Sequence, residues 1–179
     1  MKYFQRLLLF LAITLSAAGI IQASAFADDG DTITDAQLVQ IRTRCSEIQT
    51  TLSHVHANDA LLRVNRGQLY ERISTKLMAP LNSRIVLNKL DSTSLVSVTT
   101  KYETDLKKFR ANYQAYEELL SDTMKINCVN QPARFYDSLQ QARIKRGEVY
   151  VSTQELTADI AQYKQAFDDF AKPYKEGRV

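Results

Sequence analysis

The chain has 179 residues, with 23 Lys and Arg against 20 Asp and Glu, so its formal net charge is +3. Two of the basic residues lie in an N-terminal segment that we expect to be removed, which leaves +1 and takes away the electrostatic basis for nucleic-acid binding. Glycine occurs only five times, so a glycine-rich loop that cradles phosphate is disfavoured.

The first 27 residues have the pattern of a secretory signal peptide. Lys2 and Arg6 precede an apolar stretch at 7–21, and Ala25-Phe26-Ala27 provides a small-residue cleavage site. Cleavage before Asp28 leaves 152 residues, enough for one domain with a substantial core. We therefore expect an exported protein, located in the periplasm, on the cell surface or outside the cell.

An uncleaved membrane anchor is the alternative for this segment. The stretch at 7–21 is shorter than the ~20 residues of a spanning helix, and it contains Ser16 and Gly19. No second apolar stretch of spanning length follows it. We expect contact with a membrane only during export, or if the anchor is retained.

After a polar leader at 28–33, an apolar stripe predicts a long first helix. Thr34 and Gln37 form a capping-box signature at its start. The stripe then advances by three and four residues, which places one seam along a helix that must be buried against partner helices. Its members are Leu38, Ile41, Cys45, Ile48, Leu52, Val55, Leu62, Leu69 and Ile73. We expect this helix at about 35–79, kinked or ended by Pro80, and its apolar spacing is compatible with an extension to residue 90.

Two further helices are predicted after a reversal of the chain. Asp91-Ser92-Thr93-Ser94 is a cluster of turn and capping residues, and apolar spacing resumes over about 94–126. The pattern breaks at 127–131, Pro132 suits the first turn of a new helix, and a third stripe runs over about 132–172. Residues 34–174 are thus predicted to be all-α, an elongated antiparallel three-helix bundle or coiled coil.

Cys45 and Cys128 are the two cysteines, and an oxidising compartment favours a disulfide between them over two buried free thiols. Facing residues of an antiparallel hairpin have a nearly constant sum of residue numbers. The cysteine pair sets this sum at 173, which puts the reversal near residues 86–87, between Pro80 and Ser94. The cysteine pairing and the turn residues therefore predict the same hairpin.

Four charged residues occupy seam positions, namely Asp59, Arg66, Asp105 and Arg146. The same alignment places Asp59 near Arg146, and Arg66 near Asp105. A buried ion pair adds little net stability but is costly to break. We expect both pairs to be buried and to fix helix register rather than to catalyse a reaction.

The residues that usually carry catalysis are not arranged for it. His54 and His56 point about 200° apart on a helix, so they do not bind one metal together. No nucleophile elbow, P-loop or dinucleotide fingerprint occurs. Glu117-Glu118 and Asp168-Asp169 are neighbours on surface turns, without the facing geometry of a glycosidase pair. We predict no catalytic residue, no cofactor, no metal site and no enzymatic activity.

Eight basic residues are expected around the middle of the bundle, and such a girdle suits an anionic glycan, an envelope polymer or an acidic partner. They are Arg63, Arg72, Lys101, Lys107, Lys108, Arg110, Arg143 and Lys145. Glu71, Glu103 and Glu148 lie among them. A solvated surface with ion pairs is therefore the alternative.

Three segments of the chain carry a resemblance to known proteins. They are Lys76 to Ile85 (KLMAPLNSRI), Lys89-Leu90-Asp91, and Cys128 to Arg146 (CVNQPARFYDSLQQARIKR). The chain resembles uncharacterised exported helical, coiled-coil-like proteins of reduced-genome, episymbiotic bacteria. The resemblance implies an envelope or secreted protein and carries over no catalytic residue.

The function predicted from these features is that of an exported, non-enzymatic helical module that binds a protein or glycan in the cell envelope or at the cell surface. One alternative is a periplasmic holdase, which needs exposed apolar surface such as Leu61, Val64, Val86, Leu87, Val96 and Val151. Another is a regulator of a cell-wall hydrolase. Seams this long are also compatible with a homodimer.

Overall fold

The computed structural model describes residues 33–177, which are helical except for short connections and contain no strand. The all-α prediction is therefore confirmed for this part of the chain. The predicted signal peptide at 1–27 and nearly all of the polar leader lie outside the described residues. Within the described range, no helix combines the length and the apolarity that a membrane span requires.

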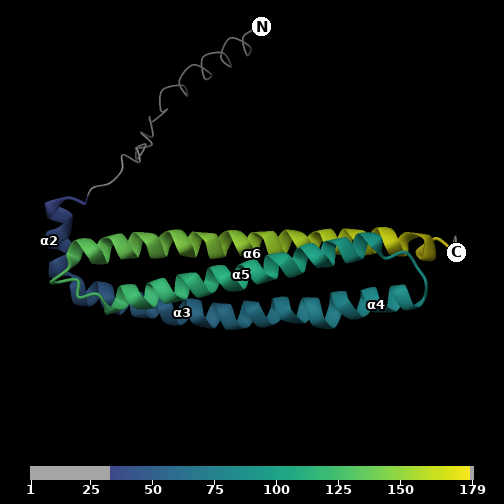
Figure 1. Cartoon of the computed structure of the whole chain (residues 1–179), viewed down its shortest axis with the longest axis horizontal. Helices are drawn as coiled ribbons and strands as arrows, with labels where there is room; N and C mark the ends of the chain where they lie inside the picture. The colour runs from purple at the N-terminus through teal and green to yellow at the C-terminus, as the bar shows by residue number, and fades with distance from the viewer. Residues whose placement is uncertain (1–32, 178–179) are drawn as a thin grey trace, which may run out of the picture. The chain divides into compact units, whose positions relative to one another are not determined.

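The first predicted helix is divided at Arg44. A capping box at Thr34 and Gln37 starts α2 (Asp35–Thr43), and α3 (Cys45–Arg72) follows after Arg44, whose backbone is non-helical at φ −105° and ψ 15°. The Thr43 hydroxyl donates to the carbonyls of Val39 and Gln40, a side-chain bond that competes with regular helix. At Arg44 α2 turns across the axis of α3 (Figure 1), and the prediction of one continuous helix from residue 35 is wrong.

Pro80 does not end the first long helical stretch, which continues to Leu87. A π-helix, η1 (Ile73–Met78), precedes α4 (Ala79–Leu87), and Pro80 lies in the first turn of α4. Proline has no N–H and clashes with the carbonyl four residues earlier. In η1 the hydrogen bonds span five residues, as in the bond from Ala79 N–H to the Ser74 carbonyl, and this wider turn accommodates the proline.

Two buried tyrosines from other helices hold the ends of η1. The Tyr102 hydroxyl donates to the Tyr70 carbonyl at 2.9 Å. The Tyr163 hydroxyl donates to the Asn82 side chain of α4 at 2.9 Å and lies 3.4 Å from the Met78 carbonyl as a longer, shared contact. A buried backbone carbonyl without a partner is costly, so these bonds stabilise the irregular turn.

The reversal lies at 88–92, slightly before the predicted cluster. Lys89 adopts a positive φ of 57°, and the Asp91 carboxylate accepts a hydrogen bond from the Thr93 N–H at 2.9 Å as α5 (Thr93–Lys125) begins. After a second connection, α6 (Pro132–Lys175) starts with Pro132 in its first turn. It passes through Pro173 and ends a few residues later than predicted.

The long helices run side by side, with α5 between α6 and the α3–α4 stretch (Figure 1). The contact between α5 and α6 is by far the most extensive, whereas α3 meets α5 over a shorter length and barely approaches α6. This unequal packing leaves space between α3 and α6.

Two clusters of buried residues form the core. One surrounds the disulfide and includes Leu120, Phe135 and Ala142, and the other surrounds η1 and includes Met78 and Tyr102. Between Leu52 and Tyr70, α3 contributes no buried residue, and Leu62 and Leu69 are each 53% exposed. The prediction that the whole first seam is buried is therefore wrong in this stretch, because α6 does not close over it.

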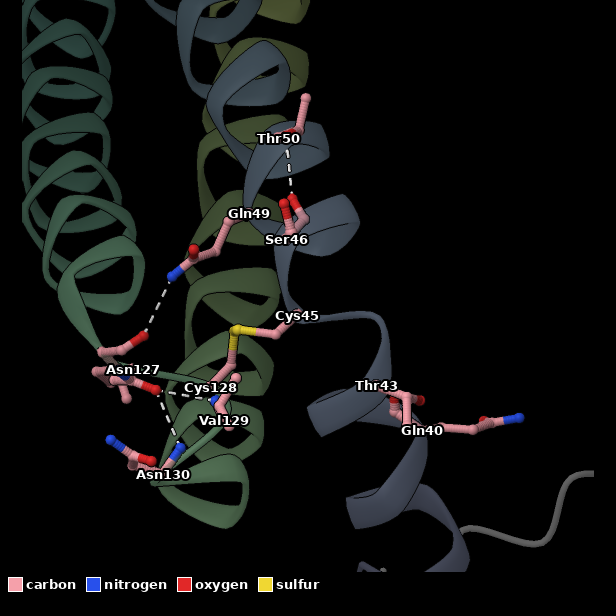
Figure 2. Close-up of a disulfide and its surroundings, with 11 residues drawn as sticks. Gln40, Thr43, Cys45, Ser46, Gln49, Thr50, Asn127, Cys128, Val129 and Asn130 are labelled. Atoms are coloured by element: carbon pink, nitrogen blue, oxygen red, sulfur yellow. Dashed lines mark hydrogen bonds between the residues drawn. A yellow bond between two sulfur atoms is a disulfide. The ribbon is translucent and has the colours of Figure 1, made fainter.

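The disulfide joins Cys45, at the start of α3, to Cys128, in the connection before α6 (Figure 2). Their Cα atoms are 5.6 Å apart, within the usual range, and 83 positions separate them in the sequence. The Asn127 side chain accepts hydrogen bonds from the N–H groups of Val129 and Asn130, which shapes the connection around Cys128. Gln49 of α3 donates to the Ile126 carbonyl at 3.4 Å and adds a second link there.

Candidate functional site

The space between α3 and α6 contains a cavity of about 640 Å³, here called the arginine groove. Aromatic residues of α5 form its floor, and α3 and α6 form its walls. The lining residues are Asp59, Leu62, Arg63 and Arg66 of α3, Phe109, Tyr113 and Tyr116 of α5, and Arg143, Arg146, Gly147, Val149, Tyr150, Thr153 and Gln154 of α6. Its volume lies in the range of sites that take small ligands or anchoring side chains.

The groove carries positive charge, since four arginines and one aspartate line it and give a formal net charge of +3. No carboxylate within residues 33–177 lies at ion-pair distance from Arg66 or Arg143. Arg143 donates to the Gln140 side chain at 3.3 Å, and the Arg63 guanidinium lies 4.8 Å from the centre of the Tyr113 ring. These cationic groups therefore remain available to an anionic partner.

A polar bridge closes one end of the groove. Arg146 donates to both carboxylate oxygens of Asp59, at 2.7 and 2.9 Å, and the Tyr116 hydroxyl donates to the same carboxylate at 2.6 Å. This is the Asp59–Arg146 pair expected from the sequence, although the Arg146 side chain is 56% exposed and only the Asp59 end is well covered.

The bridge shifts the pKa values of its members in opposite directions. Burial alone would raise the pKa of Asp59, but the hydrogen bonds from Arg146 and Tyr116 outweigh it and hold the pKa below the ordinary value. The same contact raises the pKa of Arg146, while burial and the bond to Asp59 raise the pKa of Tyr116. The bridge is thus ionised at neutral pH, with a charged pair and a neutral phenol.

A second polar chain supports the floor. The Tyr113 hydroxyl donates to Glu117 at 3.0 Å, and the other carboxylate oxygen of Glu117 contacts the His56 ring of α3. Burial and the bond to Glu117 raise the pKa of Tyr113 to about 12. These contacts orient the Tyr113 ring, against which the Arg63 guanidinium packs.

A second cavity, of about 560 Å³, lies beyond the bridge toward the disulfide and is lined in part by α2. Tyr116, Arg143 and Arg146 line both cavities, so the Asp59–Arg146 bridge is the wall between them.

The expected pair of Arg66 with Asp105 does not form. Asp105 accepts a hydrogen bond from Lys101 at 2.8 Å, and Arg66 is exposed in the arginine groove. The residue-number sum of facing pairs is 173 for His56 with Glu117 but rises to 177 for Ser74 with Glu103 and 181 for Asn82 with Thr99. A constant sum therefore misplaces the partner of Asp105 by more than one helical turn.

Asp159 is a buried acid that the sequence reasoning missed. Its side chain is fully buried, one oxygen accepts from Lys101 at 2.5 Å, and the other oxygen has no hydrogen-bond partner within the described part of the chain. Burial raises the pKa of Asp159. The signal was present in the sequence, because Asp159 lies three residues after Leu156 and four before Tyr163 in the third seam.

The eight basic residues of the predicted girdle are divided among different contacts. Lys101, Lys108, Arg110 and Lys145 each form ion pairs, with Asp105 and Asp159, Glu155, Glu71 and Glu148 respectively. Arg63 and Arg143 line the arginine groove, and Arg72 lines a cavity of about 460 Å³ between α3 and α5. Lys107 is exposed on α5. The sequence reasoning did not include Arg66 and Arg146 in this set, although both line the groove.

Within residues 33–177, no three His, Cys, Asp or Glu side chains gather as possible metal ligands. His54 is exposed, and His56 contacts Glu117. The arrangement at the groove offers positive charge over an aromatic floor, which suits binding. Comparison of the chain with protein-family models, curated proteins and solved structures gives no match.

Proposed function

We propose that this chain is an exported, non-enzymatic three-helix bundle that binds a partner in the cell envelope or at the cell surface through the arginine groove. The observation that carries the proposal is the half-exposed seam of α3, at Leu62 and Leu69. Arg66 and Arg143 line the same groove as Leu62 and have no carboxylate at ion-pair distance within residues 33–177. Apolar side chains at seam spacing are normally covered, and neighbouring cations that repel one another gain from an anionic partner. Both unmet requirements lie on one face.

The disulfide and the N-terminal sequence support the export part of the proposal. A disulfide persists in an oxidising compartment, and residues 1–27 have the charge, length and cleavage pattern of a signal peptide. N-terminal sequencing of the protein recovered from its own cells tests this part, with Asp28 expected as the first residue.

Site-specific photocrosslinking in intact cells tests the groove as the binding site. A photoreactive amino acid at Leu62 reports on the groove, and the same amino acid at Lys107 reports on an exposed position outside it. We expect a discrete adduct from position 62 and none from position 107. Equal labelling from both positions, or none from position 62, would contradict the proposal.

Two glycines provide matched variants for the same experiment. A Cβ atom added at Gly147 or at Gly67 meets no atom within 4 Å, but Gly147 lines the arginine groove and Gly67 lines the cavity between α3 and α5. Gly147→Leu should fill the groove and remove the adduct, whereas Gly67→Leu should leave it intact. Because both changes replace a helical glycine, both should keep or raise helix stability.

A holdase is a second proposal, supported by apolar side chains at the α4–α5 turn. Leu87 is 80% exposed and Val86 is 56% exposed. If this surface shields unfolded proteins, the mature protein should suppress aggregation of a model client at equal molar ratio, and a Val86→Ser/Leu87→Ser variant should not. No suppression by the unmodified protein would remove this proposal.

A further inference from the structure

Resting on the proposed function, we infer that the occupant of the arginine groove is an acidic amphipathic helix of a partner protein, which adds a fourth helix between α3 and α6. This inference names the chemistry of the partner, and it rests on the shape, charge and extent of the groove.

The shape of the α3 wall is that of an unfilled helix-packing seam. Leu62 and Leu69 are seven residues apart, so they lie on one face, and each is 53% exposed. A heptad-spaced apolar face is complemented best by side chains with the same spacing, which is what an amphipathic helix provides.

The α6 wall permits close approach of a backbone. Gly147 lines the groove with open space above its Cα, and Tyr150 is 64% exposed beside it. A glycine lets a neighbouring helix come near, and an exposed tyrosine offers apolar area together with a hydroxyl. Both features suit helix packing at this wall.

The positive charge of the groove favours a negatively charged occupant. Arg66 on the α3 wall and Arg143 on the α6 wall have no carboxylate at ion-pair distance within residues 33–177, so they flank the apolar floor from both sides. A helix with an apolar face and acidic flanks places carboxylates at both walls.

The charge also argues against a second copy of this chain. In a two-fold symmetric dimer the same patch faces itself, which would bring the Arg66 and Arg143 side chains of both copies together. Like charges across an interface cost binding energy, so a self-association through this groove is disfavoured.

The extent of the groove fits a short helical contact. The Asp59–Arg146 bridge closes one end, and the α3 residues that line the groove run from Asp59 to Arg66. The exposed seam continues past them to Leu69, about 15 Å from Asp59 at ~1.5 Å per residue. That length accepts two to three helical turns, a small interface of the kind found in transient complexes. An anionic polysaccharide would satisfy the arginines but leave Leu62 and Leu69 uncovered, so the helix is the better complement.

Peptide binding to the oxidised full-length mature protein tests the inference. The probe is a fluorescent, stapled helix of ~14 residues (four turns) with leucines along one face and glutamates on both flanks, measured by anisotropy. The comparison probes are the same helix with lysines in place of the glutamates, a scrambled acidic peptide, and an alginate oligosaccharide as anionic glycan. We expect only the acidic amphipathic helix to bind, with affinity that falls as salt rises.

Charge reversal locates the binding on the protein. Arg66→Glu/Arg143→Glu should raise the dissociation constant of the acidic helix by about tenfold or more, because two ion pairs become two repulsions. The same variant should now bind the lysine helix. The control Lys76→Glu/Lys107→Glu changes the charge equally at exposed positions outside the groove and should leave binding unchanged.

The outcomes separate this inference from the proposed function. Binding of the alginate probe in place of the acidic helix, with loss in the Arg66→Glu/Arg143→Glu variant, would overturn the helix and keep the groove as a binding site. Binding of neither probe, or binding that the groove variant does not change, would also overturn the inference. Photocrosslinking from position 62 tests the proposed function separately, because it does not depend on the chemical class of the partner.

Discussion

Asp59 of α3 and Arg146 of α6 are joined by two hydrogen bonds, although 87 positions separate them in the sequence. The pair fixes the level of α3 against α6, where backbone contact is sparse. It also closes one end of the arginine groove and separates it from the cavity near α2. One ion pair therefore links the register of the fold to the shape of the proposed binding site.

Breaking this pair from the arginine side should be costly. Among the described residues, Arg146→Ala leaves the well-covered Asp59 carboxylate with only the Tyr116 hydroxyl as hydrogen-bond donor, so we expect a loss of about 1–3 kcal/mol in the free energy of unfolding. A double-mutant cycle with Asp59→Ala, followed by urea unfolding, should give a coupling of about 1 kcal/mol. Strict additivity of the two changes would show that the pair does not stabilise the fold.

The same variant should alter the response to acid. The pKa of Asp59 is lowered in the folded protein, so the stability it contributes is present above its unfolded pKa of about 4 and is lost as pH falls through the lowered value. Arg146→Ala removes the main bond that stabilises the ionised Asp59 carboxylate. The free energy of unfolding of this variant should therefore fall less steeply as the pH is lowered. Urea midpoints between pH 2 and pH 7 measure the effect, with Arg134→Ala as a matched exposed-arginine control on α6.

Asp159 should affect the pH dependence of stability in the opposite direction to Asp59. Its pKa is raised by burial, so the folded state holds a proton that the unfolded state releases, and stability falls as pH rises from the unfolded pKa through the raised one. Asp159→Asn removes the buried charge and should stabilise the protein by about 1 kcal/mol at pH 7, with a smaller gain near pH 4. The amide oxygen still accepts from Lys101.

Asp105 provides the contrasting variant beside it. Burial would raise its pKa, but the bond from Lys101 and the neighbouring Asp159 hold it below the ordinary value, so its ionised form is favoured in the folded protein. Asp105→Asn should therefore destabilise at pH 7 and have less effect in acid. The same sign of change for Asp105→Asn and Asp159→Asn at pH 7 would contradict this assignment.

The disulfide should stabilise mainly one end of the molecule. It closes a loop of 83 positions, which corresponds to about 4–5 kcal/mol in the chain-entropy model. Cys45→Ser/Cys128→Ser should lower the free energy of unfolding by that order, and hydrogen exchange should increase first around Phe135 rather than around Tyr102. Uniform loss of protection along the helices would show that the two core clusters unfold as one unit.

Substitutions at Leu62 and at Leu52 should differ sharply in their effect on stability, although both residues belong to the same apolar stripe. Leu62 is 53% exposed, so Leu62→Ser should change stability by no more than about 0.5 kcal/mol. Leu52 is buried beside the disulfide, so Leu52→Ala should cost about 2 kcal/mol or more. Thermal or urea unfolding of both variants makes the comparison, and equal losses would place the middle of α3 in the core.

Much of the helical organisation was predictable because it depends on local pattern. The capping box at Thr34, the turn residues around Asp91 and the position of Pro132 each act within a few residues, and the helices begin or reverse near them. The Cys45–Cys128 link was expected from an oxidising compartment, and the Asp59–Arg146 pair followed from seam spacing and the register that this link sets.

Other features depend on contacts between distant segments. The break at Arg44 and the π-helix before Pro80 arise where side chains and neighbouring helices compete with regular hydrogen bonding, as the Tyr102 bond to the Tyr70 carbonyl shows. The residue-number sum of facing positions is not constant along α3 and α5, and this separates Arg66 from Asp105.

Apolar spacing, caps and turn residues by themselves determined that this chain is helical, where its long helices reverse, and which cysteines meet, because those features are encoded at short range or by a single pairing. Only the tertiary structure decided which part of the first seam stays uncovered. A stripe of leucines specifies a face to be packed, but not how closely the third helix approaches it. Since α6 packs mainly on α5, Leu62, Leu69 and Arg66 remain exposed.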